Sequence, residues 1–169
     1  MRYSNREHTF VEMNDGRIVP VADDNPDWRA ILASGGSVEP FTVSVAEAQA
    51  TRIAEAWVGM LARVNAAAVS VTTGAGTHQY GLDPVTQDNL QKALLAVLSG
   101  ISPNPRPWTP KGVAAPISIT HDEVKAIAGA VGFAYEAHVQ AYLAHKRAIM
   151  ALTTAAAVAA YDLTQGWPA

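Results

Sequence analysis

Cysteine is absent from this 169-residue chain. Its absence excludes a disulfide framework, a thiolate metal site and a cysteine nucleophile. Charged residues are scarce, at 16% of the chain, and aromatic residues reach only 7%. An intrinsically disordered protein would have more charge and fewer than the 49% hydrophobic residues found here. The composition therefore predicts a folded protein, either one domain with a tail or two small domains.

Clustered positive charge and long apolar runs are also lacking. The 12 lysines and arginines are scattered, and the formal net charge is −3. Nucleic-acid binders usually gather basic residues on one face, so we expect no nucleic-acid partner. No stretch reaches the roughly 18 consecutive apolar residues of a membrane span, and residues 1–10 do not resemble a secretory signal. We therefore expect no membrane association, and folding in a cytoplasm.

Alanine, by contrast, is abundant, with 32 of the 169 residues. It is the best helix former, so we expect much of the chain to be helical. Almost all of it lies after position 45, whereas residues 1–43 hold seven acidic residues and four arginines. This shift divides the chain into residues 1–43, an attachment segment, and residues 44–169, an alanine-rich helical domain.

The N-terminal segment carries the signals of a β-hairpin and a short helix. Residues 8–13 and 17–21 are β-prone runs on either side of Asn14-Asp15-Gly16, a typical hairpin turn. Asn25-Pro26 is typical of a helix start and Gly35-Gly36 of a helix end. Two strands and one short helix are too few to bury a core. We expect this segment to dock on its own helical domain, a second copy or a partner protein.

Three helix starts follow. Ser44 with Glu47, and Thr120 with Glu123, fit the capping box, in which each side chain accepts from the backbone of the other residue. Asp83 followed by proline fits an acidic N-cap. These signals predict helices over residues 45–72, 84–99 and 121–151. A threonine at position 154 predicts a last short helix over residues 155–161.

Apolar residues recur at helical spacing along the first and third of these helices. The first stripe comprises Ala46, Ala50, Ile53, Trp57, Met60, Val64, Ala67 and Val71. The second comprises Val124, Ile127, Val131, Ala134, His138, Tyr142, His145, Ile149 and Leu152. A helix of about 30 residues is roughly 45 Å long, which is more than a small core requires. We expect the long helix to pack along another helix, within the chain or between copies.

Prolines at positions 103, 105, 107, 110 and 116 disfavour a helix over residues 101–120. Residues 117–119 alternate like a strand, and residues 77–80 are a second candidate that can pair with them. These patterns predict a mainly α fold: a hairpin or bundle of three to four helices, with a small N-terminal β-hairpin and a proline-rich loop.

Residue patterns typical of catalysis are missing. The chain has no nucleophile elbow, no glycine-rich phosphate loop and no pair of carboxylates in an apolar setting. We therefore expect no enzyme activity and no cofactor. His138 and His145 are separated by about 10 Å of helical rise, too far to bind one metal ion within a chain. We expect no metal site and interpret both histidines as polar residues of the helix seam.

Aromatic residues at helical spacing favour packing over a ligand-stacking platform. Trp167 would fray unless it packed, so we expect it to be buried in the body or in a partner. The candidates for a partner interface are Trp108, His138, Tyr142, His145 and Trp167.

Three segments of the second part of the chain are distinctive: Thr86-Gln87-Asp88-Asn89-Leu90, Arg106-Pro107-Trp108-Thr109-Pro110-Lys111-Gly112 and the ending Gly166-Trp167-Pro168. With them, residues 45–168 resemble an uncharacterised domain family of tailed bacteriophages and prophages, encoded among tail-fibre and tail-fibre-assembly genes. The resemblance brings no catalytic residue with it.

The resemblance implies a structural or adaptor component of the virion tail, associated with the tail fibre or tip, that acts by protein–protein assembly. Its partners would be other tail proteins and copies of itself, with a trimer expected by analogy, and it would occupy the host cytoplasm during assembly. Two alternatives stay open. One is a tail-fibre assembly chaperone absent from the finished virion, and the other is a carbohydrate-binding tip module that recognises the host surface through exposed aromatic residues.

Overall fold

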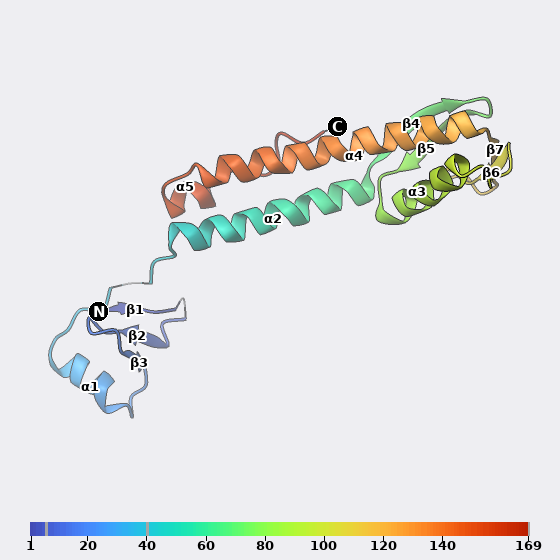
Figure 1. Cartoon of the computed structure of the whole chain (residues 1–169). Coiled ribbons are helices and arrows are strands. Elements are labelled where there is room, and N and C mark those ends of the chain that lie inside the picture. The colour runs from blue at the N-terminus through green and yellow to red at the C-terminus, as the bar shows by residue number, and fades with distance from the viewer. Residues whose placement is uncertain (6, 40, 169) are drawn as a thin grey trace. The chain divides into compact units, whose positions relative to one another are not determined.

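The computed structural model describes residues 1–5, 7–39 and 41–168. The chain divides into two compact units, Met1–Glu47 and Ala48–Ala169 (Figure 1). A buried cluster of apolar side chains lies in each unit.

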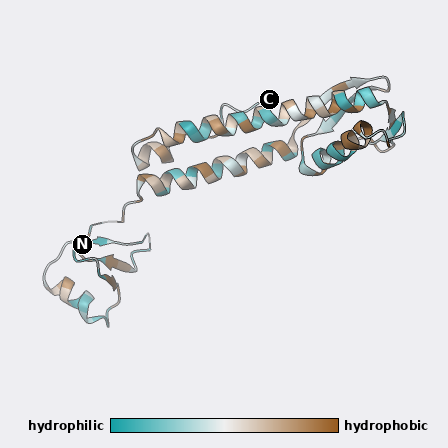
Figure 2. Cartoon of the chain, in the orientation of Figure 1, coloured by the Kyte–Doolittle hydropathy of each residue, from teal (hydrophilic) through white to brown (hydrophobic). Residues whose placement is uncertain are grey.

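The first unit contains a three-stranded antiparallel sheet in the order β1 (Arg2–Tyr3), β2 (Phe10–Glu12) and β3 (Ile18–Pro20), followed by helix α1 (Pro26–Ala33). Val11 of β2 lies opposite Val19 of β3, and both are buried together with Trp28 and Ile31 of α1. Figure 2 shows the hydrophobic character of β2 and β3. The expectation that this segment lacks a core of its own is therefore wrong, because the sheet and α1 cover each other.

The second unit contains most of α2 (Val45–Ala66), then β4 (Ala68–Thr73), β5 (Gly76–Gly81), α3 (Pro84–Leu98), β6 (Arg106–Trp108), β7 (Ile117–Ile119), α4 (His121–Met150) and α5 (Ala155–Ala159). Its core contains residues from α2, β5, α3, β7 and α4. The cap signals are confirmed at α3 and α4: Asp83 accepts from the Thr86 N–H, and Thr120 and Glu123 form a capping box.

The first long helix ends earlier than its expected end at residue 72. Residues 68–73 form β4, which pairs antiparallel with β5 from Ala68 opposite Gly81 to Thr73 opposite Gly76. The reason lies in the β-branched residues of this segment, which suit a strand, and in the alternating burial that places Val69 and Val71 against the core. The expected pairing of residues 77–80 with 117–119 is also wrong, because β7 pairs with β6 instead.

The predicted fold class is wrong as well, because the chain forms more strands than the sequence pattern indicated. The described residues are 48% helical and 16% strand, with five helices and three small antiparallel sheets. The protein is thus mixed α/β, and not a mainly α bundle with a single hairpin. Helical periodicity identified the helices, but short strands with few residues leave a weak periodic signal.

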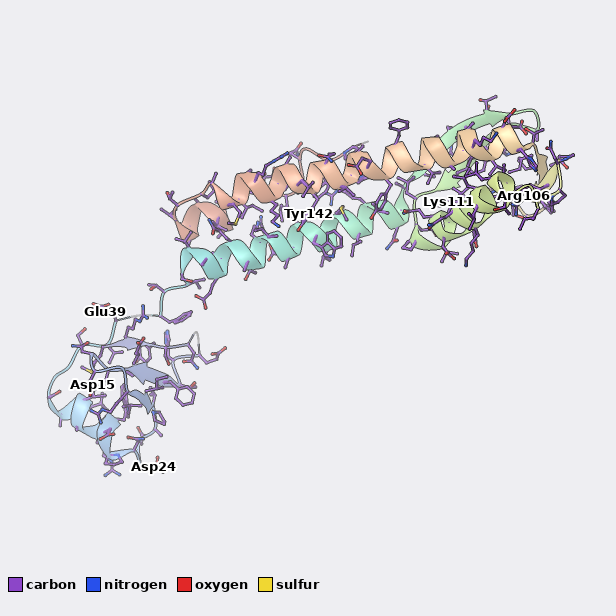
Figure 3. All side chains as sticks on the ribbon, in the orientation of Figure 1. Asp15, Asp24, Glu39, Arg106, Lys111 and Tyr142 are labelled. Atoms are coloured by element: carbon purple, nitrogen blue, oxygen red, sulfur yellow. The ribbon has the colours of Figure 1, made fainter. Side chains whose placement is uncertain are left out.

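The apolar stripe of α4 is buried by the chain itself. Val124, Ile127 and Val131 belong to the core formed with α2, α3 and β5, and His138, His145 and Ile149 are also buried. Helix α2 runs antiparallel alongside α4, because Gln49 donates to the carbonyl of Leu152 at 2.9 Å while Trp57 contacts Tyr142 (Figure 3). The long helices therefore pack within one chain. No helix in the described part of the chain is long and apolar enough to cross a membrane.

Candidate functional site

Two candidate residues, His145 and Trp167, meet in a cluster with Arg63 and Tyr161, here called the Trp167 cluster. The ring centroids of His145 and Trp167 are 4.6 Å apart, and the Arg63 guanidinium lies 4.7 Å from the indole centroid. The Tyr161 hydroxyl is 2.9 Å from Nδ1 of His145. The cluster thus joins α2, α4 and the segment that follows α5.

That segment returns along the helices through specific backbone contacts. Arg52 of α2 donates from Nε to the carbonyl of Tyr161 at 3.1 Å, and the Trp167 indole donates to the carbonyl of Leu163 at 2.7 Å. Gly166 has a positive φ of 80°, which favours glycine, and it lies against the His145 ring. Trp167 is half-buried against its own chain, so a pocket in a partner is not needed to hold it.

The surroundings of the two seam histidines disfavour their charged form. Burial lowers the pKa of His138 and of His145, and the positive charge of Arg63 lowers both further. For His145, the Gln165 backbone and Asp162 act in the opposite direction. His138 Nδ1 and His145 Nε2 are buried without a hydrogen-bond partner among the described residues. Protonation of either histidine would place a charge on the buried face of α4, so the charged form is disfavoured.

Tyr142, the fourth candidate, lies between α2 and α4 (Figure 3). Its ring packs edge-on against Trp57 of α2, with centroids 5.2 Å apart. The sequence interpretation placed Trp57 on the inner stripe of α2, but 43% of this residue is exposed. The inner face of α2 instead buries Ala56, Met60 and Val64.

A second apolar face of α2 is exposed, and we call it the α2 apolar surface. It comprises Ala50, Ala54, Trp57, Val58 and Leu61. Val58 is 65% exposed and Leu61 is 37% exposed. These positions follow the three- and four-residue spacing of one helix face. This surface is not evident from the sequence, because the two apolar stripes of α2 overlap and periodicity alone does not say which one the chain covers.

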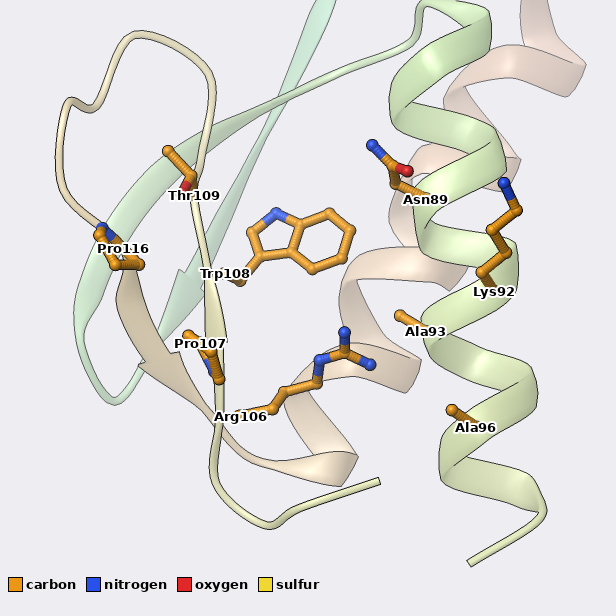
Figure 4. A pocket seen from close by; sticks show the side chains of 9 residues that line it. All are labelled: Asn89, Lys92, Ala93, Ala96, Arg106, Pro107, Trp108, Thr109 and Pro116. Atoms are coloured by element: carbon orange, nitrogen blue, oxygen red, sulfur yellow. The ribbon is translucent and has the colours of Figure 1, made fainter. Parts of the chain in front are cut away.

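Trp108, the remaining candidate, lies apart from the others, on β6. It lines a cleft of about 560 Å³ between α3 and the β6–β7 hairpin, here called the Trp108 cleft (Figure 4). The residues that line it are Asn89, Lys92, Ala93, Ala96, Arg106, Pro107, Trp108, Thr109 and Pro116. Trp108 and Arg106 are two residues apart in the strand, so both side chains lie on the face directed at α3.

Alanines create the hollow of the Trp108 cleft. Ala93 and Ala96 lie on α3 opposite Trp108 and Arg106, and their short side chains leave the space unfilled (Figure 4). A hollow of about 200 Å³ borders Trp108 as well, and Asn89 and Thr109 line both. The sequence showed the aromatic and basic residues but not the alanines that face them.

Two carboxylates of the second unit, those of Asp83 and Glu123, take part in helix caps. Hydrogen bonds from Thr86 lower the pKa of Asp83, and hydrogen bonds from the Thr120 and Gly74 backbones lower the pKa of Glu123. Over residues 1–5, 7–39 and 41–168, no group of three or more histidine, aspartate and glutamate residues is placed to hold a metal ion. The α2 apolar surface and the Trp108 cleft are the best-defined candidate sites.

Comparison with known proteins identifies a family. Residues 47–164 match the model of a domain of unknown function, DUF4376. The match covers more than half of the chain, and the chain belongs to this family. No curated protein and no solved structure matches the chain.

Proposed function

We propose that this DUF4376 protein is a structural or adaptor component of a bacteriophage tail, acting by protein–protein assembly. The observation that carries the assembly role is the α2 apolar surface. Helix α2 is apolar on two faces, one buried against its own chain and the other exposed through Trp57, Val58 and Leu61. A helix with apolar residues on both sides is usually covered on both sides.

The partner at this surface is a second copy of the chain. Ala50 and Ala54 are small and exposed, which permits close approach of another helix. The neighbouring Glu55 is paired with Arg52 of its own chain at 2.6 Å. A symmetric contact brings identical residues together, so a surface whose charges are already neutralised favours self-association. A trimer is the expected state, by analogy with fibre-linked proteins.

The tail location rests on the resemblance of residues 45–168 to tail-fibre-associated phage domains. Two compact units, each with its own buried cluster, suit an adaptor that binds a different protein through each unit. The first unit is the expected attachment module toward another tail protein.

Sedimentation velocity at several concentrations tests the self-association. The wild-type chain should form oligomers, and Val58→Glu or Leu61→Glu should shift it to monomer because each buries a charge in the contact. Leu98→Glu on α3 is the matched control, since Leu98 is 68% exposed and lies outside the α2 apolar surface. A wild-type chain that stays monomeric at its highest soluble concentration, or equal effects of all three variants, would contradict the assembly role.

Quantitative mass spectrometry of intact virions tests the location. A structural component should be present in a fixed number of copies per particle. Its absence from virions, together with improved fibre solubility on co-expression, would show an assembly chaperone instead.

A further inference from the structure

We propose that the Trp108 cleft is a binding site for a carboxylated sugar residue, with the sugar carboxylate on Arg106 and its ring against Trp108. This site shares no residue with the α2 apolar surface, so its failure or success leaves the assembly role untouched.

The positive charge of the cleft favours an anionic ligand. Arg106 is half-buried, and its Nε is buried without a hydrogen-bond partner in the described part of the chain. Lys92, the other cation of the lining, is already paired with Asp88 at 2.5 Å. Among the described residues no acidic side chain lines the cleft or pairs with Arg106. A guanidinium presents a planar fork of donors that matches a carboxylate. A carboxylate bound in the cleft would therefore give the Arg106 guanidinium an ion-pair partner.

The shape and the remaining side chains select the rest of the ligand. The cleft volume of about 560 Å³ lies within the range of small-molecule sites. Trp108 contributes a half-buried ring wall, and Pro107 and Pro116 add exposed apolar surface at its edge. Asn89 and Thr109 are exposed and supply an amide and a hydroxyl for the hydroxyl groups of a sugar. The adjoining hollow, which shares these two residues and Trp108, offers room for a second ring.

Other anions fit these observations less well. A nucleic-acid backbone needs several unpaired cations in a row. Among the described residues, this cleft has one cation without an ion pair, and the chain has a net charge of −3. A peptide carboxyl terminus would use the same guanidinium but would not use the indole face and both polar side chains. Arg106 has no ion pair among the described residues, and its guanidinium lies 5.9 Å from the Trp108 ring centroid. Together with the neutral polar groups of the cleft, this pair of side chains favours a carboxylated ring rich in hydroxyls.

NMR titration of the ¹⁵N-labelled full chain tests the site. The probes are glucuronate, glucose as the neutral sugar, acetate as the carboxylate without a ring, and a short peptide with a free carboxyl terminus. The resonances to follow are the Trp108 indole N–H and the Arg106 Nε–H. Glucuronate should give saturable shifts at both, and affinity at least tenfold higher than that of glucose or acetate.

Two variants test separately how the charge and the shape of the Trp108 cleft contribute to glucuronate binding. Arg106→Gln should weaken glucuronate binding about tenfold or more, because it removes a charge-assisted pair. Ala96→Leu should block binding by filling the hollow while both cations remain. Lys146→Gln, which removes an exposed cation of α4 outside the cleft, is the matched control and should leave binding unchanged. The amide spectrum of each variant reports whether it is folded.

Four results would overturn the proposal. Equal binding of acetate and glucuronate would show an anion site without a sugar subsite, and tighter binding of the peptide would assign the cleft to a protein partner. Shifts that never saturate, or glucuronate binding unchanged in folded Arg106→Gln, would show that the cleft is no site for this ligand.

Discussion

The His145 imidazole packs on the Trp167 indole, with ring centroids 4.6 Å apart and planes inclined by 34°. Trp167 follows α5, whereas His145 lies in the C-terminal half of α4, so this contact holds the returning segment against the long helix. The guanidinium of Arg63, on α2, lies 4.7 Å from the centroid of the same Trp167 indole. One tryptophan therefore stabilises the packing of three segments.

Replacing Trp167 with alanine should lower the free energy of unfolding by about 2 kcal/mol, less than for a fully buried tryptophan because the residue is only half-buried. The measurement is urea denaturation followed by circular dichroism. Phe133→Ala is the control, since Phe133 is 82% exposed and its loss should change stability by about 0.5 kcal/mol or less. Equal effects of the two variants would show that the Trp167 cluster does not stabilise the fold.

Stability should fall on mild acidification. The pKa values of His138 and His145 are lowered below the ordinary 6.5 by burial and by Arg63. The unfolded chain therefore binds protons at a higher pH than the folded chain does, and the free energy of unfolding should decrease as the pH falls through the ordinary histidine value of 6.5. The decrease should end once the pH is below the folded-state pKa values.

Denaturant titration across this pH range measures the effect. The double variant His138→Gln, His145→Gln should flatten the pH dependence, because the carboxylates with lowered pKa values titrate in a more acidic range. A wild-type profile that is flat or rises on acidification would contradict the neutral state of the two histidines.

Glu123 should stabilise the fold in two ways, through the helix cap and through a contact with the β4–β5 turn. Its carboxylate accepts from the Thr120 N–H at 2.6 Å and also from the Gly74 N–H in the β4–β5 turn. Glu123→Ala removes both contacts and should lower the free energy of unfolding by more than the loss of an exposed carboxylate of the same helix does. Glu136→Ala, an exposed carboxylate of the same helix, should cost about 0.5 kcal/mol or less in thermal or urea unfolding. A smaller loss at Glu123 than at Glu136 would refute this double role.

Two glycines of α4 offer stabilising substitutions. Gly129 and Gly132 lie inside the helix with no other atom within 4 Å of an added Cβ. Alanine at either position should raise stability by about 0.5–1 kcal/mol, because glycine is a poor helix former. Gly100→Ala is the contrast: its φ of +72° is unfavourable for alanine, so that variant should lose stability. Differential scanning calorimetry of the three variants checks both signs, and a destabilised Gly129→Ala would show a contact that requires glycine.

Local signals in the sequence were sufficient for several elements. The cap of α3 at Asp83 and the capping box of Thr120 and Glu123 are confirmed, because a cap depends only on residues within one helical turn. The α4 stripe was also identified as a buried face, since a helix of 30 residues repeats its apolar spacing often enough to be clear. The short strands were harder to place. Residues 68–72 continued the helical spacing of α2, and their β-branched residues form a strand once β5 lies beside them.

The candidate sites also depend partly on the local sequence and partly on the tertiary structure. The sequence by itself determined which residues are aromatic, cationic or small, and it located the helices that carry them. Which face of α2 is covered, which alanines face Arg106 and Trp108, and which side chain meets His145 were decided by the tertiary structure. The physical reason is that helical periodicity and capping act over a few residues, whereas burial, unpaired cations and clefts depend on contacts between segments distant in the chain.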